Sequence, residues 1–121
     1  MGRERMAVGR RGEDVALKFL EDMGMVLVER NWRSGHNELD LVMEDERFLR
    51  IVEVKSLVYP NVINPFEEVR WKKQRRVMAA ARHFVAMKGV EKEIVFDVVS
   101  VVFNGEIYKV EYFPEAFVPS F

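Results

Sequence analysis

Two carboxylates and a lysine interrupt a pair of segments that are otherwise apolar on the same side. Residues 38–43 and 48–55 alternate as half-buried strands do, and residues 44–47 join them as a hairpin turn. Because side chains alternate along a strand, Glu53 and Lys55 share a face with Ile51. Charged side chains are costly to bury without a partner, so these positions are candidates for chemistry rather than for packing.

The length of the turn sets the register of this hairpin. A four-residue turn places Asp40 opposite Ile51 and diagonal to Glu53. It also places Glu38 opposite Glu53. An even slip in register leaves each side chain on its own face, so we expect Asp40, Glu53 and Lys55 to point to one side.

Two carboxylates that project together form an oxygen site of the kind that binds Mg²⁺ or Mn²⁺ with several waters retained. A lysine beside them could orient or deprotonate a metal-bound water, or stabilise charge that develops on a phosphate. A carboxylate-bound divalent cation and a neighbouring lysine are the groups that a metal-dependent hydrolysis of a phosphodiester bond uses. The alternative is a structural salt-bridge cluster, because exposed faces of strands do carry such pairs.

A third carboxylate, Glu13, lies in the apolar sector of a helix expected over residues 8–23, which Gly24 ends. At 100° per residue, Glu13 falls between Leu17 and Leu20. A desolvated carboxylate there is expensive, so either Glu13 joins the site or it stays near solvent, where the N-terminal end of the helix favours a negative charge.

The composition describes one globular domain over residues 1–121. Hydrophobic residues make up 49% of the chain, charged residues 32%, and the formal net charge is −1. The absence of cysteine excludes a disulfide framework, a Cys-ligated metal and a thiol nucleophile. No apolar run approaches the ~20 residues of a membrane span, and the first residues lack the apolar core of an export signal. We therefore expect a cytoplasmic protein.

A strongly basic segment, residues 69–90, contains seven cations and no acid. We expect a helix over residues 67–88, with four of these cations on the side opposite its apolar positions: Lys72, Arg75, Arg76 and Arg82. A solvated helix face and a nucleic-acid-binding stripe are both open interpretations. Lys73 falls near the apolar sector; it either reaches the sheet site or snorkels to solvent, and we favour snorkelling.

The remaining segments complete the order α-β-β-β-α-β-β. Residues 25–33, 94–103 and 106–112 have the pattern of strands, and residues 56–64 that of a loop. This order predicts an α/β fold, a mixed central sheet flanked by helices. In the apolar strand, we expect Asp97 to satisfy buried backbone donors rather than to bind metal. We also expect His83 to join the basic face and Trp32 to pack at the core boundary.

The order and spacing of these residues resemble the PD-(D/E)xK nuclease superfamily, which includes restriction endonucleases and Holliday-junction resolvases. The closer similarity is to the small bacterial proteins called YraN, and it covers nearly the whole chain. The segments that carry it are Gly12-Glu13, Arg30-Asn31, 38–42, 52–55, 65–73, Ala80-Ala81, 96–99 and Ala116-Phe117.

The resemblance implies a restriction-endonuclease-like fold and an endonuclease that uses Mg²⁺ or Mn²⁺ on DNA, including branched or damaged forms. It implies that Asp40 and Glu53 are metal ligands, together with the carbonyl of Val54. It further implies that Lys55 is the catalytic lysine and that Glu13 is directed at the same metal.

Four positions differ from the family pattern or lack a role in it. Asn37 stands where relatives carry glycine, and asparagine is the residue that best replaces glycine at positive φ. Ser56-Leu57 stand where an arginine often follows the lysine, which puts one phosphate contact in question. Glu38 matches a family position without an assigned role.

Three function classes follow. The chain is a nuclease, a module that binds nucleic acid or a protein partner without cleaving, or an interaction subunit whose acidic cluster is a relic. The intact set of Glu13, Asp40, Glu53 and Lys55 favours the first class over the third, and nothing in the sequence separates the first from the second. A chain this small offers little surface to embrace a duplex, so a homodimer is expected.

Overall fold

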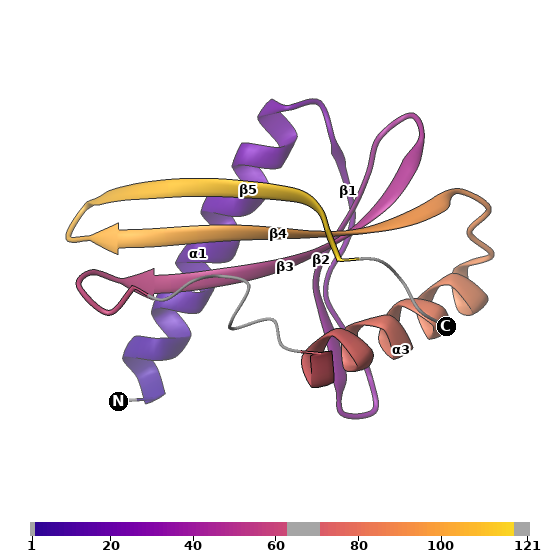
Figure 1. Ribbon diagram of the computed structural model, residues 1–121, viewed down its shortest axis with the longest axis horizontal. Coiled ribbons are helices and arrows are strands. Elements are labelled where there is room, and N and C mark those ends of the chain that lie inside the picture. The colour runs from indigo at the N-terminus through magenta and orange to yellow at the C-terminus, as the bar shows by residue number, and fades with distance from the viewer. Residues whose placement is uncertain (1, 63–70, 118–121) are drawn as a thin grey trace.

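The computed structural model describes residues 2–62 and 71–117, and it has the expected α/β arrangement (Figure 1). The elements are α1 (Gly2–Asp22), β1 (Val26–Ser34), β2 (Asn37–Glu44), β3 (Phe48–Val58), α3 (Trp71–Lys88), β4 (Glu93–Asn104) and β5 (Ile107–Phe117). Five strands form one sheet in the order β1-β2-β3-β4-β5. The β3–β4 pair is parallel and the other pairs are antiparallel, so the prediction of a mixed sheet is confirmed.

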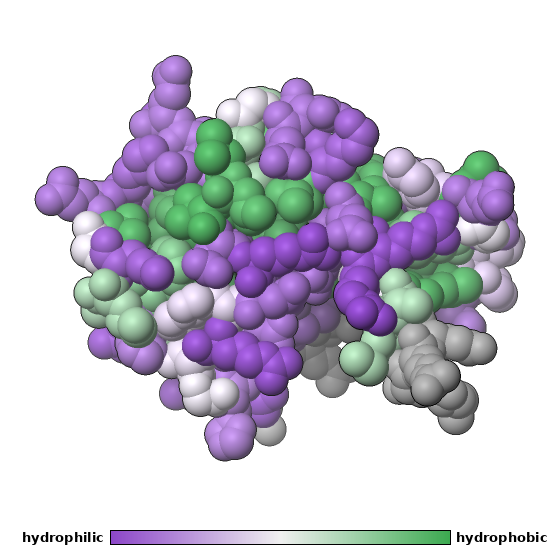
Figure 2. Space-filling model, turned by 180° about the vertical axis from the view of Figure 1, so that it is seen from behind, coloured by the Kyte–Doolittle hydropathy of each residue, from purple (hydrophilic) through white to green (hydrophobic). Residues whose placement is uncertain are grey.

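Helices α1 and α3 cover opposite faces of the sheet (Figure 1). Alternation along β3 divides its apolar side chains between two cores: Ile51 packs with α3, and Val52 packs with α1. Ala16 and Leu20 of α1 and Phe84 of α3 are fully buried in these cores. The outward surface on the α1 side is mostly hydrophilic, with a hydrophobic band across it (Figure 2).

The C-terminal end of α1 is fixed by the expected glycine. Gly24 has a φ of 97°, and its N–H donates to the carbonyl of Glu21 at 2.9 Å. The N–H of Met25 donates to the carbonyl of Leu20 at 3.1 Å, which completes a Schellman cap. The start of the helix was predicted too late, at residue 8 rather than Gly2, because its first turns consist of good helix formers without an apolar period.

The third strand is longer than its sequence pattern indicates. Residues 56–58 were expected in a loop, but they continue β3, and Val58 pairs with Phe103 of β4. Parallel pairing with β4 supplies their hydrogen bonds, which is a tertiary effect that local alternation does not report. Residues 59–62 of the predicted loop do form a turn followed by irregular structure. Residues 63–70 lie outside the described part of the chain.

The outer strand β5 runs to Phe117, five residues beyond its expected end. Pro114 is tolerated because the outer side of an edge strand needs no partner. The register shifts opposite Phe96 and Val98, and Glu115 adopts a φ of 51° there. No helix in the described part of the chain combines the length and the apolar character needed to cross a bilayer.

Candidate functional site

The register of the β2–β3 hairpin differs from the expected one by two residues. Glu44 pairs with Leu49, so the turn begins one residue later than predicted. Asp45 explains the shift, because its Oδ1 accepts hydrogen bonds from the N–H groups of Arg47 (2.9 Å) and Phe48 (2.8 Å). The hydrogen bonds of the Asp45 side chain therefore set the position of the turn, which the number of residues between the two apolar segments did not predict.

Two pairings predicted from the sequence are therefore wrong. Ile51 pairs with Val42 instead of Asp40. Glu38 is not opposite Glu53; it lies next to β1, where it forms an ion pair with Arg33 at 3.2 Å. Because the slip is even, the expected face of each side chain is unchanged.

Asp40 lies where β2 separates from β3. The ladder between the two strands ends with the pair Leu41–Val52, and the β1–β2 hairpin then turns away beside α3 (Figure 1). The N–H of Val54, the next group of β3 that points toward β2, donates instead to Asp40 Oδ2 at 2.9 Å. The carboxylate thus satisfies a backbone donor that would otherwise lack a partner.

One cavity of about 970 Å³ collects the residues that the sequence singled out. Glu13 of α1, Asp40 of β2, and Glu53, Val54 and Lys55 of β3 all line it. Glu53 is 4% exposed and Lys55 is 9% exposed, so both charged groups are buried. The structure therefore brings the predicted site residues to one place.

Lys73 of α3 also lines this cavity, and its Nζ forms an ion pair with Glu53 Oε1. Our preference for snorkelling was wrong. The Lys55 Nζ lies 3.7 Å from the same oxygen. Burial lowers the pKa of Lys73, but Glu53 and its hydrogen bond raise it more, so the pKa lies above its usual value. Glu53 is thus held between two ammonium groups.

The acidic groups of the cavity repel one another. The pKa of Asp40 is raised well above its ordinary value, first by burial and then by the negative charge of Glu53, with a further contribution from Glu13. The hydrogen bond from Val54 and the charge of Lys73 act in the opposite direction. Burial and the neighbouring carboxylates therefore favour the protonated form of Asp40.

A close approach between α1 and β3 positions Glu13. Gly12 faces Ser56, and a Cβ on Gly12 would lie 2.8 Å from the Ser56 Cβ and 1.7 Å from its Oγ. Only a glycine permits this contact. The neighbouring Glu13 side chain is 16% exposed, and its Oε1 lies 3.4 Å from the Nε of Arg30, which also pairs with Asp14 at 2.7 Å.

The three carboxylates share the cavity without forming a ready-made ligand set. Among the described residues, no group of three or more His, Cys, Asp or Glu side chains is close enough together to hold a metal ion. Lys73 and Lys55 contact Glu53 in this arrangement. A divalent cation at Glu53 would have to share this carboxylate with the two ammonium groups or displace one of them.

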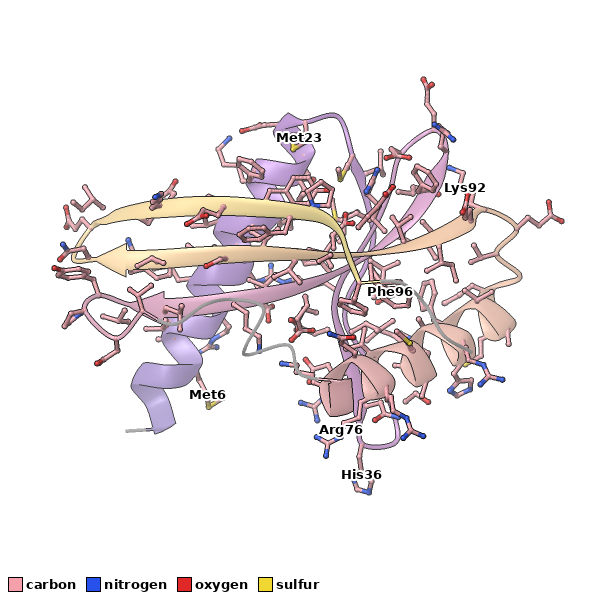
Figure 3. The ribbon with its side chains drawn as sticks, viewed as in Figure 1. Met6, Met23, His36, Arg76, Lys92 and Phe96 are labelled. Atoms are coloured by element: carbon pink, nitrogen blue, oxygen red, sulfur yellow. The ribbon has the colours of Figure 1, made fainter. Side chains whose placement is uncertain are left out.

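Three of the four cations predicted on the basic side of α3 have side chains that the structure describes. Arg75, Arg76 and Arg82 are exposed, as the sequence predicts, and the side chain of Lys72 lies outside the described residues. His83 is also exposed and contacts Ser34 at the end of β1. His36 at the tip of the β1–β2 hairpin and Arg76 project at the same end of the molecule (Figure 3).

Trp32 packs at the core boundary as expected, with its ring centroid 5.3 Å from that of Phe84.

Asp97 accepts a hydrogen bond from the N–H of Glu115 at 2.9 Å, which confirms its predicted role toward backbone donors. It also accepts hydrogen bonds from Arg50 (3.1 Å) and from the Tyr112 hydroxyl (2.7 Å). This polar cluster lies outside the acidic cavity and is fully paired within the fold.

Comparison with known proteins identifies related chains. The family model described as "Uncharacterised protein family UPF0102" matches residues 12–101. A UPF0102 protein of Porphyromonas gingivalis is 38% identical over 111 residues, which cover 90% of this chain and 82% of that protein. A UPF0102 protein of Bacteroides thetaiotaomicron is 34% identical over 116 residues, 96% of each chain. One from Anaeromyxobacter dehalogenans is 41% identical over 117 residues, 96% of this chain and 87% of that protein.

Proposed function

This chain belongs to the uncharacterised protein family UPF0102, and on that premise we propose that it is a metal-dependent nuclease that hydrolyses phosphodiester bonds of DNA. The observation that carries the proposal is the convergence of Asp40, Glu53 and Lys55 with Glu13 in one cavity. Their order and spacing resemble the PD-(D/E)xK superfamily, whose fold has the same mixed sheet between helices.

The donor set of the cavity suits a divalent cation. Asp40 and Glu53 supply carboxylate oxygens, and Val54 and Glu13 line the same space, so these residues would hold Mg²⁺ or Mn²⁺. Burial raises the pKa of Asp40 most, and the nearby charges of Glu53 and Glu13 raise it further. A bound cation would offset the repulsion between these carboxylates. Such a cation would polarise the phosphodiester and activate a water molecule.

Lys55 supplies fixed positive charge beside the reacting phosphate. Its side chain is buried, and its ammonium group lies 3.7 Å from Glu53 Oε1, so the carboxylate holds it in place. Because the Lys55 side chain is buried, solvent screens its charge less than in bulk water, and a fixed cation there stabilises the negative charge that develops on a phosphate more than it would in solution. Lys55 is therefore the residue on which cleavage, rather than metal binding, should depend.

The nucleic acid would approach along α3. Lys73 reaches into the cavity from this helix, while Arg75, Arg76 and Arg82 are exposed on it. Exposed arginines supply the phosphate contacts that dominate affinity for DNA. We expect branched DNA to suit a homodimer of the chain, in which two cavities would serve two strands.

A second candidate function is a module that binds nucleic acid or a protein partner without cleaving. The ion pair between Lys73 and Glu53 favours it, because it partly neutralises the acidic cavity without any metal. In that case the basic face of α3 binds the nucleic acid or the protein partner, and the charged residues of the cavity stabilise the fold.

A cleavage assay separates the two candidates. Linear duplex, single-stranded and four-way DNA are each incubated with the protein in Mn²⁺ and in a chelator. The nuclease proposal predicts that at least one DNA is cut, only in Mn²⁺, and that Lys55→Met removes cleavage but keeps Mn²⁺ binding. Binding of these DNAs by the wild-type protein without cleavage would support the second candidate.

A further inference from the structure

A cation that belongs to the protein already occupies the side of Glu53 that faces the cavity. The ammonium group of Lys73 contacts Glu53 Oε1. The Glu53 side chain is 4% exposed, whereas that of Lys73 is 39% exposed. A buried carboxylate needs a positive partner, and in this structure α3 supplies it from the edge of the cavity.

We propose that Lys73 and a divalent cation compete for Glu53, so that entry of the cation displaces the Lys73 ammonium group toward solvent. This inference rests on the proposed function, since it requires a divalent cation at Asp40 and Glu53. The competition follows from charge: an ammonium group and a divalent cation at the same carboxylate oxygen repel each other strongly where little water screens them.

The geometry allows the displacement. Lys73 lies in the first turn of the described part of α3, and its side chain is partly exposed. A lysine has a flexible four-carbon stem, so its head group can swing outward while the helix stays in place. Lys55 differs from Lys73, because it is buried and belongs to a central strand. Lys73 is therefore the cation that can leave.

The displacement would connect the cavity with the basic face of α3. Arg76 lies three residues from Lys73, so the two side chains are neighbours on the helix surface. A phosphate bound by Arg76 attracts the Lys73 ammonium group and thereby weakens its hold on Glu53. Because such coupling is reciprocal, DNA should raise the affinity for the divalent cation, and the cation should raise the affinity for DNA.

The test measures Mn²⁺ affinity from the electron paramagnetic resonance signal of free Mn²⁺. Lys73→Met should bind Mn²⁺ at least about fivefold more tightly than the wild-type chain, the lower end of common coupling effects. Lys73→Arg keeps the charge and should resemble the wild type. The matched control Lys88→Met removes the same charge from the exposed last turn of α3 and should leave the affinity unchanged.

A second readout needs no substitution. Lys73 and Lys88 of the wild-type chain are acylated with an amine-reactive reagent and quantified by mass spectrometry. Mn²⁺ should increase the modification of Lys73 several-fold relative to that of Lys88, because the displaced ammonium group becomes accessible.

The outcomes distinguish this inference from the proposed function. If the wild-type chain and its variants bind no Mn²⁺, the metal site itself is wrong. If the wild-type chain binds Mn²⁺ but Lys73→Met binds it equally or more weakly, and the labelling of Lys73 does not rise, then competition by Lys73 is wrong and the metal site stands.

Discussion

The carboxylate of Asp40 accepts a hydrogen bond from the backbone N–H of Val54, at 2.9 Å, where β2 separates from β3. This bond replaces a rung of the sheet with a side chain. It fixes the carboxyl group of Asp40 in the same cavity as Glu53 and gives Asp40 a structural task in addition to its proposed chemical one.

Asp40→Asn should separate these two tasks. An asparagine oxygen can still accept the bond from Val54. The cost of burying a charged group and its repulsion by Glu53 and Glu13, which together raise the pKa of Asp40, disappear. We expect the free energy of unfolding without metal to stay equal or to rise by up to about 1 kcal/mol. Asp40→Ala leaves the Val54 N–H without this acceptor and should cost about 1–3 kcal/mol. Urea denaturation of both variants checks this, and equal losses would contradict it.

Gly12 should tolerate no side chain. In Gly12→Ala the new Cβ meets the Ser56 Cβ at 2.8 Å, and overpacking of this kind costs about 1–3 kcal/mol. Gly9, in the same helix, has no atom within 4 Å of an added Cβ, so Gly9→Ala should be neutral or stabilise by up to about 1 kcal/mol. Thermal unfolding compares the two. A loss at Gly9 as large as that at Gly12 would contradict this prediction, because Gly9 lacks the close contact that is held responsible at Gly12.

The exposed arginines of α3 should set the salt dependence of DNA binding. Each phosphate contact adds about 0.9 to the magnitude of the slope of log affinity against log salt. Replacing Arg75 and Arg76 together by Gln should weaken binding and flatten this slope by nearly two units, with almost no change in melting temperature. The control pair Lys18→Gln and Lys109→Gln removes two side chains that are each 77% exposed on other elements. An equal effect of the control pair would remove α3 from the binding surface.

Asp45 should make the stability of the hairpin depend on pH. Burial raises the pKa of Asp45, but hydrogen bonds from Arg50 and from the N–H groups of Phe48 and Arg47 outweigh it and lower the pKa to about 2. A lowered pKa stabilises the fold above the unfolded value of 3.8 and loses this effect as the pH falls toward 2.

Wild type should therefore exceed Asp45→Asn in free energy of unfolding near neutral pH. We expect roughly 1 kcal/mol, because the side chain is partly exposed and solvent screens the charge. Chemical denaturation from pH 6 to pH 3 should show this difference shrinking below about pH 4. A difference that stays constant over this range would mean that the charge of Asp45 contributes nothing.

The face of each site residue could be predicted from the sequence, but its exact neighbour could not. Strand alternation alone places Asp40, Glu53 and Lys55 on one side, and this survives the change in register. The register itself depends on the side chain of Asp45, which closes the turn one residue later than the count of residues implies.

Contacts between distant elements limited the prediction further. The length of β3 depends on parallel pairing with β4, and the ion pair between Lys73 and Glu53 depends on where α3 crosses the sheet. The sequence did contain a signal for Lys73, a cation near the apolar sector of an otherwise one-sided basic helix. Its partner is on another element, so periodicity could not decide between the cavity and the solvent.

The most direct test of the account is the binding of Mn²⁺ by the metal-free chain, measured by calorimetry with Asp40→Asn and Asp22→Asn alongside. Asp22 is the matched control, because its side chain is 67% exposed at the end of α1 and does not line the acidic cavity. The account predicts Mn²⁺ binding by the wild-type chain and by Asp22→Asn, and an affinity at least about tenfold lower for Asp40→Asn, which corresponds to ~1.4 kcal/mol. Equal affinities for Asp40→Asn and the wild type, or no binding by the wild-type chain at millimolar Mn²⁺, would contradict it.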